Sequence, residues 1–156
     1  MPETCQVKIY RLVFSTALIA AFALAGSVRA ESNWETDLKK AQEQAKATNK
    51  LVFLDFTGSD WCGYCIRLNK DILSQPQFKD YATKNLVLVE IDFPRRKAQS
   101  VDLRKQNQQL AEQYQIEGFP TIIVLNGSGR KVWRYDGYFT GGPDAFIAEL
   151  EKARKS

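Results

Sequence analysis

Two nearly continuous apolar runs dominate the middle of the chain, and each predicts a strand that is buried on both faces. They cover Leu51–Phe56 and Leu86–Asp92. A third run, Thr121–Leu125, is followed by the turn-forming cluster Asn126–Gly129 and then by Lys131–Tyr135. Because Asn, Gly and Ser favour tight turns, the last two segments are predicted to form an antiparallel hairpin.

Apolar residues elsewhere recur at the three- and four-residue spacing of amphipathic helices. The first predicted helix covers 33–48, with a capping box formed by Ser32 and Glu35 at its start and Asn49 at its end. The other predicted helices are Cys62–Leu73, a short helical turn at Pro76–Ala82, Val101–Tyr114 and a last helix that begins at Pro143.

This alternation of helices and strands predicts an α/β fold, a three-layer α/β/α sandwich. Strands that are joined through a helix usually pair in parallel, with a right-handed crossover. We therefore expect a mixed sheet with two or three parallel strands and an antiparallel hairpin at the C-terminal end of the chain.

The first thirty residues have the layout of a secretory signal peptide. Lys8 and Arg11 precede Leu12–Gly26, fifteen residues without a charge, and Val28–Ala30 resembles a cleavage site. A bilayer span usually needs about 20 apolar residues, although an uncleaved anchor is the alternative. We predict cleavage after Ala30, a periplasmic or secreted protein, and one folded domain over 31–156.

Composition adds few constraints beyond this domain. The chain has 156 residues and is 44% hydrophobic, which suits one packed domain. Residues 31–156 contain 19 Lys and Arg against 17 Asp and Glu, a net charge of +2 that does not indicate nucleic-acid binding. The cluster Arg95-Arg96-Lys97 is interpreted as a solvated loop. No membrane association is expected beyond the signal segment.

The cysteines are more informative. Without the signal segment, which contains Cys5, the chain has only Cys62 and Cys65. A bond between them encloses two residues and constrains little chain, so a reactive role is favoured over a structural one. The chain has no His, which argues against a zinc site, c-type haem attachment and a cysteine protease. Thiol–disulfide exchange remains, and no metal or cofactor is predicted.

The expected position of Cys62 suits this chemistry. A thiolate is the attacking form of cysteine, and the unpaired N–H groups at a helix start stabilise its negative charge. Cys65 follows one helical turn later, so it could attack a mixed disulfide on Cys62 and release the reduced substrate.

The segment Leu54-Asp55-Phe56…Trp61-Cys62-Gly63-Tyr64-Cys65 resembles the active-site region of the thioredoxin superfamily. Gly118-Phe119-Pro120-Thr121 is similar to the cis-proline loop of that family. The resemblance covers residues 33–154 and is greatest to small exported thioredoxin-like proteins.

The resemblance implies roles for individual residues. Cys62 corresponds to the attacking thiol, Cys65 to the resolving thiol, and Asp55 to a buried carboxylate that exchanges a proton with Cys65. A cap on a turn is the alternative for Asp55. The implied substrate-binding residues are Trp61, which could equally be core, together with Gly63, Tyr64, Phe119 and a cis Pro120.

The chain also departs from the family pattern. Seven positions separate Asp55 from Cys62, one more than in typical thioredoxins, and no first strand is evident. The Gly-Tyr dipeptide is similar to that of periplasmic disulfide isomerases. We therefore expect a monomeric oxidoreductase that reduces or isomerises disulfides of exported proteins, together with a redox partner. A net oxidant and a non-catalytic client-binding module remain alternatives.

Overall fold

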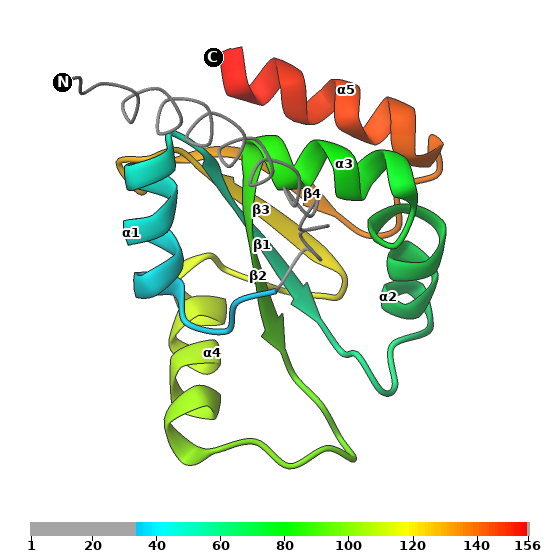
Figure 1. Cartoon of the computed structure of the whole chain (residues 1–156). Coiled ribbons are helices and arrows are strands. Elements are labelled where there is room, and N and C mark those ends of the chain that lie inside the picture. The colour runs from blue at the N-terminus through cyan, green and yellow to red at the C-terminus, as the bar shows by residue number, and fades with distance from the viewer. Residues whose placement is uncertain (1–33, 156) are drawn as a thin grey trace, which may run out of the picture.

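A mixed sheet of four strands, in the order β2-β1-β3-β4, forms the centre of the structure (Figure 1). The computed structural model describes residues 34–155, so the predicted signal segment lies outside the described residues. The strands are β1 (Leu51–Thr57), β2 (Leu86–Asp92), β3 (Thr121–Leu125) and β4 (Lys131–Asp136).

Helices cover both faces of this sheet, which confirms the predicted three-layer sandwich. Helices α1 and α4 lie on one face, while α2, α3 and α5 lie on the other (Figure 1). The helices are α1 (Leu38–Thr48), α2 (Gly63–Leu68) with a π-helical continuation η1 (Asn69–Leu73), α3 (Pro76–Asn85), α4 (Val101–Gln113) and α5 (Gly142–Lys155).

The apolar run in β1 follows from this burial, because all seven of its residues are buried. Val52 and its alternate neighbours belong to the core under α1 and α4, whereas Phe53 belongs to the core under α2, α3 and α5. The ring of Phe53 meets Phe78 edge-on, with centroids 5.6 Å apart. By the same alternation, Asp55 points toward the face that carries α2.

The predicted start of the first helix is wrong. Helix α1 begins at Leu38, five residues late, and Asp37 caps it by accepting a hydrogen bond from the Lys40 N–H at 3.1 Å. Glu35 instead forms a single parallel bridge to Val89 at the edge of β2. Its N–H and C=O are satisfied by β2, which excludes them from a helix. The sequence shows no first strand before β1, and in the structure this single bridge pairs with the outer edge of β2.

The direction of β3 also differs from the expectation for strands joined through a helix. β1 and β2 are parallel, but β3 runs antiparallel to β1, with Thr121 opposite Phe56. Helix α4 lies toward the end of the sheet to which β1 and β2 point (Figure 1). The chain leaves α4 near that end, so β3 starts there and runs back. The hairpin of β3 and β4 is antiparallel, as predicted.

Among residues 34–155, none of the helices is long and apolar enough to cross a membrane.

Candidate functional site

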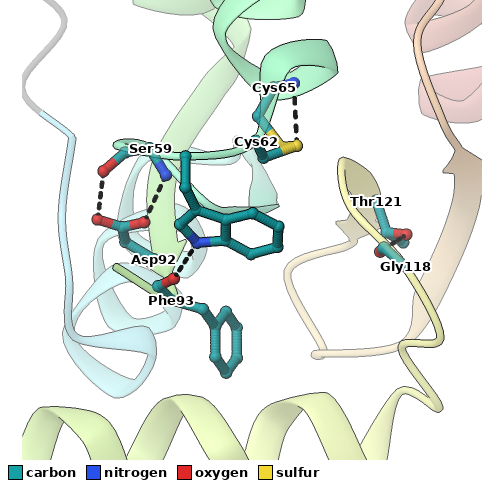
Figure 2. Close-up of a disulfide and its surroundings, with 8 residues drawn as sticks. Ser59, Cys62, Cys65, Asp92, Phe93, Gly118 and Thr121 are labelled. Atoms are coloured by element: carbon teal, nitrogen blue, oxygen red, sulfur yellow. Dashed lines mark hydrogen bonds between the residues drawn. A yellow bond between two sulfur atoms is a disulfide. The ribbon is translucent and has the colours of Figure 1, made fainter. Parts of the chain in front are cut away.

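Cys62 and Cys65 form a disulfide at the beginning of α2, with their Cα atoms 5.2 Å apart (Figure 2). Cys62 is the N-cap residue, and its Sγ accepts a hydrogen bond from the Cys65 N–H at 3.2 Å. A sulfur at this position faces the positive end of the helix, which stabilises negative charge on it. Both cysteines are largely buried, with 7% of Cys62 and 4% of Cys65 exposed.

A tight turn leads from β1 into the disulfide. The carbonyl of Gly58 accepts hydrogen bonds from the N–H groups of Trp61 (3.2 Å) and Cys62 (2.8 Å). A Cβ at Gly58 would lie 2.6 Å from the indole of Trp61, so only glycine leaves space for that ring. This turn accommodates the additional residue between Asp55 and Cys62.

The ring of Trp61 is held from several sides. Its Nε1–H donates to the carbonyl of Phe93 at 2.8 Å. Phe119 meets the ring edge-on at 6.0 Å, and the guanidinium of Arg95 lies 3.8 Å from its centroid. Trp61 is therefore both packed against its neighbours and adjacent to the disulfide.

Asp55 and Cys65 are both buried. Both line a cavity of about 260 Å³ whose other lining residues are Trp34, Thr57, Ser59, Ile66, Asn69 and Glu90. Only 7% of Asp55 is exposed, and its Oδ1 has no hydrogen-bond partner among the described residues. The extra residue in the turn thus leaves Asp55 and Cys65 on one cavity.

Burial raises the pKa of Asp55 to about 8, with repulsion from Glu90 and Asp92 adding to the effect. Glu90 is directly opposite Asp55 in the β1–β2 register. Burial, then the charge of Asp92, also raise the pKa of Glu90. A carboxyl that holds its proton near neutral pH beside a buried sulfur can give a proton to that sulfur or accept one from it.

The loop before β3 lies near the disulfide, because Phe119 contacts Trp61, the residue before Cys62 (Figure 2). The Phe119–Pro120 peptide bond is cis, and the Thr121 hydroxyl donates to the carbonyl of Gly118 at 2.9 Å. The Pro120 carbonyl accepts from the Gly137 N–H at 2.8 Å. Within residues 34–155, the N–H and C=O of Phe119 make no hydrogen bond, so they are available to an extended peptide.

Gly63 and Tyr64, between the two cysteines, are exposed. Tyr64 has 62% of its surface accessible, and a Cβ at Gly63 would have open space around it. The Tyr64 ring lies 6.4 Å from that of Tyr138, whose hydroxyl donates to Asp71 at 2.8 Å. These residues form an accessible surface beside the disulfide.

Sequence reasoning missed several residues that hold the site together. Asp92 accepts hydrogen bonds from the Ser59 N–H (2.9 Å) and hydroxyl (2.6 Å) (Figure 2). Asp60 accepts from three successive main-chain N–H groups at 95–97, and the Arg95 N–H is the largest cause of its lowered pKa. Glu90 had a usable signal, since it is a charge inside an apolar run.

In the described part of the chain, no group of three or more His, Cys, Asp or Glu side chains is placed to hold a metal ion. The site therefore combines a disulfide pair, a proton-holding carboxyl on the cavity that Cys65 lines, and a nearby loop whose Phe119 main-chain groups are unpaired within the described residues.

Comparison with known proteins gives the same picture. The model of the thioredoxin-like domain family matches residues 38–154. A protein named disulfide bond reductase DsbH, from Chlamydia pneumoniae, is 36% identical over 126 residues, covering 81% of this chain and 75% of that protein. Thioredoxin-related protein DsbJ of the same organism is 28% identical over 105 residues; the match covers 67% of this chain but only 30% of DsbJ.

Solved structures agree in fold. A structure titled DsbH oxidoreductase superimposes with a TM-score of 0.74 at 36% identity, covering 79% of this chain and 84% of that one. A thioredoxin from Thermus thermophilus gives a TM-score of 0.59 at 22% identity, covering 78% of this chain and 87% of that one, which shows the shared fold alone.

Proposed function

Since the chain belongs to the thioredoxin-like family, we propose that it is a thiol–disulfide oxidoreductase that reduces disulfides of exported proteins through Cys62 and Cys65. The observation that carries this proposal is the Cys62–Cys65 disulfide at the start of α2, beside the buried Asp55. The name of the relative at 36% identity, a disulfide bond reductase, supports reduction as the direction.

The reaction begins with the dithiol form. The Cys62 thiolate attacks one sulfur of the substrate disulfide, a mixed disulfide forms, and the first substrate thiolate leaves. Cys65 then loses its proton and attacks the Cys62 sulfur, which breaks the mixed disulfide and releases the second substrate thiolate. The substrate gains two electrons, and the enzyme is left with the Cys62–Cys65 disulfide. The released thiolates take protons from water.

Asp55 is the proton acceptor for Cys65 in this scheme. It lines the same cavity as Cys65, and its Oδ1 has no other partner in the described chain. When a reductant regenerates the dithiol, the same carboxyl returns a proton to the departing Cys65 sulfur. Its pKa of about 8 allows both roles near neutral pH, and Glu90 contributes to that value by repulsion.

The substrate is placed by the loop before β3. An extended peptide pairs with the free main-chain groups of Phe119, and Pro120 directs this segment toward the sulfurs. Trp61 shields one side of the disulfide, while Gly63 and Tyr64 provide contact surface on the other. These roles rest on the positions of the residues around the disulfide.

The signal-like sequence over 1–30 supports export to the periplasm or secretion, with cleavage after Ala30 and a folded domain over 31–156. An exported reductase needs an electron donor, so a redox partner completes the cycle. We propose that the protein acts as a monomer.

Insulin reduction with dithiothreitol tests the activity. The wild-type protein should accelerate precipitation of the insulin B chain, and Cys62→Ser should abolish the acceleration; unchanged activity of that variant would contradict the proposal.

Equilibration with glutathione tests the net direction of disulfide exchange. A reduction potential of about −270 mV supports a reductase, whereas one of about −120 mV would make the protein an oxidant. Client binding without measurable exchange would favour the non-catalytic alternative.

A further inference from the structure

Positive charge is concentrated in one part of the molecule. Residues 95–105, named the basic segment here, contain Arg95, Arg96, Lys97, Arg104 and Lys105 with Asp102 as the only acid, a net charge of +4. Residues 31–156 together have a net charge of +2, so the remainder of the domain is slightly acidic. All six charged side chains are exposed.

The basic segment is attached to the loop that precedes the disulfide. The carboxylate of Asp60, two positions before Cys62, accepts hydrogen bonds from the N–H groups at 95, 96 and 97, at 3.0, 2.7 and 3.1 Å. The Lys97 ammonium also donates to the hydroxyl of Ser59 at 3.0 Å. These bonds fix the position of the cationic residues relative to the cysteines.

A second set of contacts attaches the segment to the end of β2. The side-chain amide of Gln99 donates to the carbonyl of Asp92 at 2.9 Å, and that of Asn107, two residues beyond the segment, donates to the same carbonyl at 2.8 Å. The Asp92 carboxylate in turn holds Ser59. The segment is therefore attached to the framework of the site, although the cluster Arg95-Arg96-Lys97 at its start is predicted from sequence to be a solvated loop.

Aromatic rings connect Arg95 to the cis-proline loop. Arg95 lies over the ring of Trp61, and Trp61 contacts Phe119, which precedes the cis-proline. The Trp61 ring thus contacts both the Arg95 guanidinium and Phe119. Arg96, Arg104 and Lys105 make no side-chain hydrogen bond or ion pair in the described chain, so their charge is available to a partner.

The outer face of α4 extends this surface. Val101, which is 77% exposed, lines a hollow of about 300 Å³ together with Arg104, Lys105, Gln108, Gln109 and Glu112. The hollow combines an apolar residue, two amides, two cations and one acid, Glu112, so its net charge is positive and suits a polypeptide with acidic side chains.

We propose that the basic segment is a docking surface for acidic polypeptides and that it selects disulfide partners whose cysteines are flanked by Asp and Glu. This inference rests on the proposed thiol–disulfide exchange. Attraction between opposite charges raises the rate of encounter, and the attachment to residues 59–61 directs the encounter to the disulfide. A polypeptide fits better than a nucleic acid because the domain has a net charge of only +2.

Two disulfide peptides that differ only in their flanking charges test the inference. One carries Asp and Glu around the disulfide and the other carries Lys, with net charges of about −4 and +4. The reduced protein should reduce the acidic peptide about tenfold faster than the basic one at an ionic strength of about 20 mM. The ratio should approach one at about 500 mM, where screening is strong.

Arg96→Glu should lower this ratio about threefold or more, because it reverses a charge on the segment without removing a side-chain contact. Lys84→Glu is the matched control: it makes the same charge change on α3, at the opposite end of the sheet, and should leave the ratio unchanged. Both variants should reduce the uncharged bis(2-hydroxyethyl) disulfide at the wild-type rate.

Equal rates for the two peptides, with both being reduced, would overturn the inference and leave the proposed function intact. If neither peptide were reduced, the proposed function would fail as well. Binding to phosphatidylglycerol vesicles that is lost in Arg96→Glu, combined with equal peptide rates, would assign the surface to an anionic membrane and overturn the polypeptide assignment.

Discussion

The buried carboxyl of Asp55 makes the stability of the folded protein depend on pH. Its pKa is about 8 in the folded protein against an ordinary value of 3.8. Below pH 3.8 both folded and unfolded chains hold the proton, and no cost arises. As pH rises, the unfolded chain releases its proton first, so stability falls until about pH 8. The cost is on the order of 4 kcal/mol at pH 7 and 6 kcal/mol above pH 8.

Asp55→Asn removes this cost but introduces a buried amide. The amide would lack a partner, since Oδ1 of Asp55 already has none in the described chain. An unpaired buried polar group of this kind costs about 1–3 kcal/mol of stability. The variant should therefore be more stable than wild type by about 1–3 kcal/mol at pH 7. The gain should grow to about 3–5 kcal/mol at pH 9 and fall to about zero, or become a loss, at pH 5.

Urea unfolding of the oxidised protein, followed by tryptophan fluorescence at pH 5, 7 and 9, measures these differences. Asp80→Asn is the matched control, because Asp80 is an exposed carboxyl on α3. Its stability difference from wild type should not change with pH. A constant difference between Asp55→Asn and wild type across this range would refute the argument from burial.

Two other predictions concern the core and the loop beside the disulfide. Phe53→Ala should destabilise the protein by about 3–5 kcal/mol, measured by the same urea unfolding, since Phe53 is fully buried against three rings; a loss below about 1 kcal/mol would contradict this packing. Asp60→Ala should increase amide hydrogen exchange at 95–97, because these N–H groups lose their acceptor. Unchanged protection there would show that the loop is held by other contacts.

The strands and the disulfide region could be predicted because their signals are local. The apolar runs at β1 and β2 fix where strands form, and the spacing of Cys62 and Cys65 places two sulfurs one helical turn apart. The turn cluster at 126–129 likewise fixes the hairpin. Each of these features depends on residues that are close in sequence.

Features that depend on distant residues could not be predicted. Glu35 lies outside α1 because its main-chain groups bond to β2, more than fifty residues later in the chain. A capping-box pattern contains no information on that distant partner. The direction of β3 depends on where α4 lies. The role of Asp60 appears only once its acceptor oxygens are seen beside 95–97. Tertiary contacts therefore determine the start of α1, the direction of β3 and the role of Asp60, which local sequence patterns do not predict.

The central claim is that Cys62 attacks the substrate disulfide and Cys65 resolves the product. Mass spectrometry of a Cys65→Ser variant, after incubation with a disulfide peptide, tests it most directly. The account predicts that the peptide remains attached through a disulfide that maps to Cys62, and that the wild-type protein accumulates no such adduct because Cys65 releases it. An absent adduct, or one located elsewhere in the chain, would contradict the account.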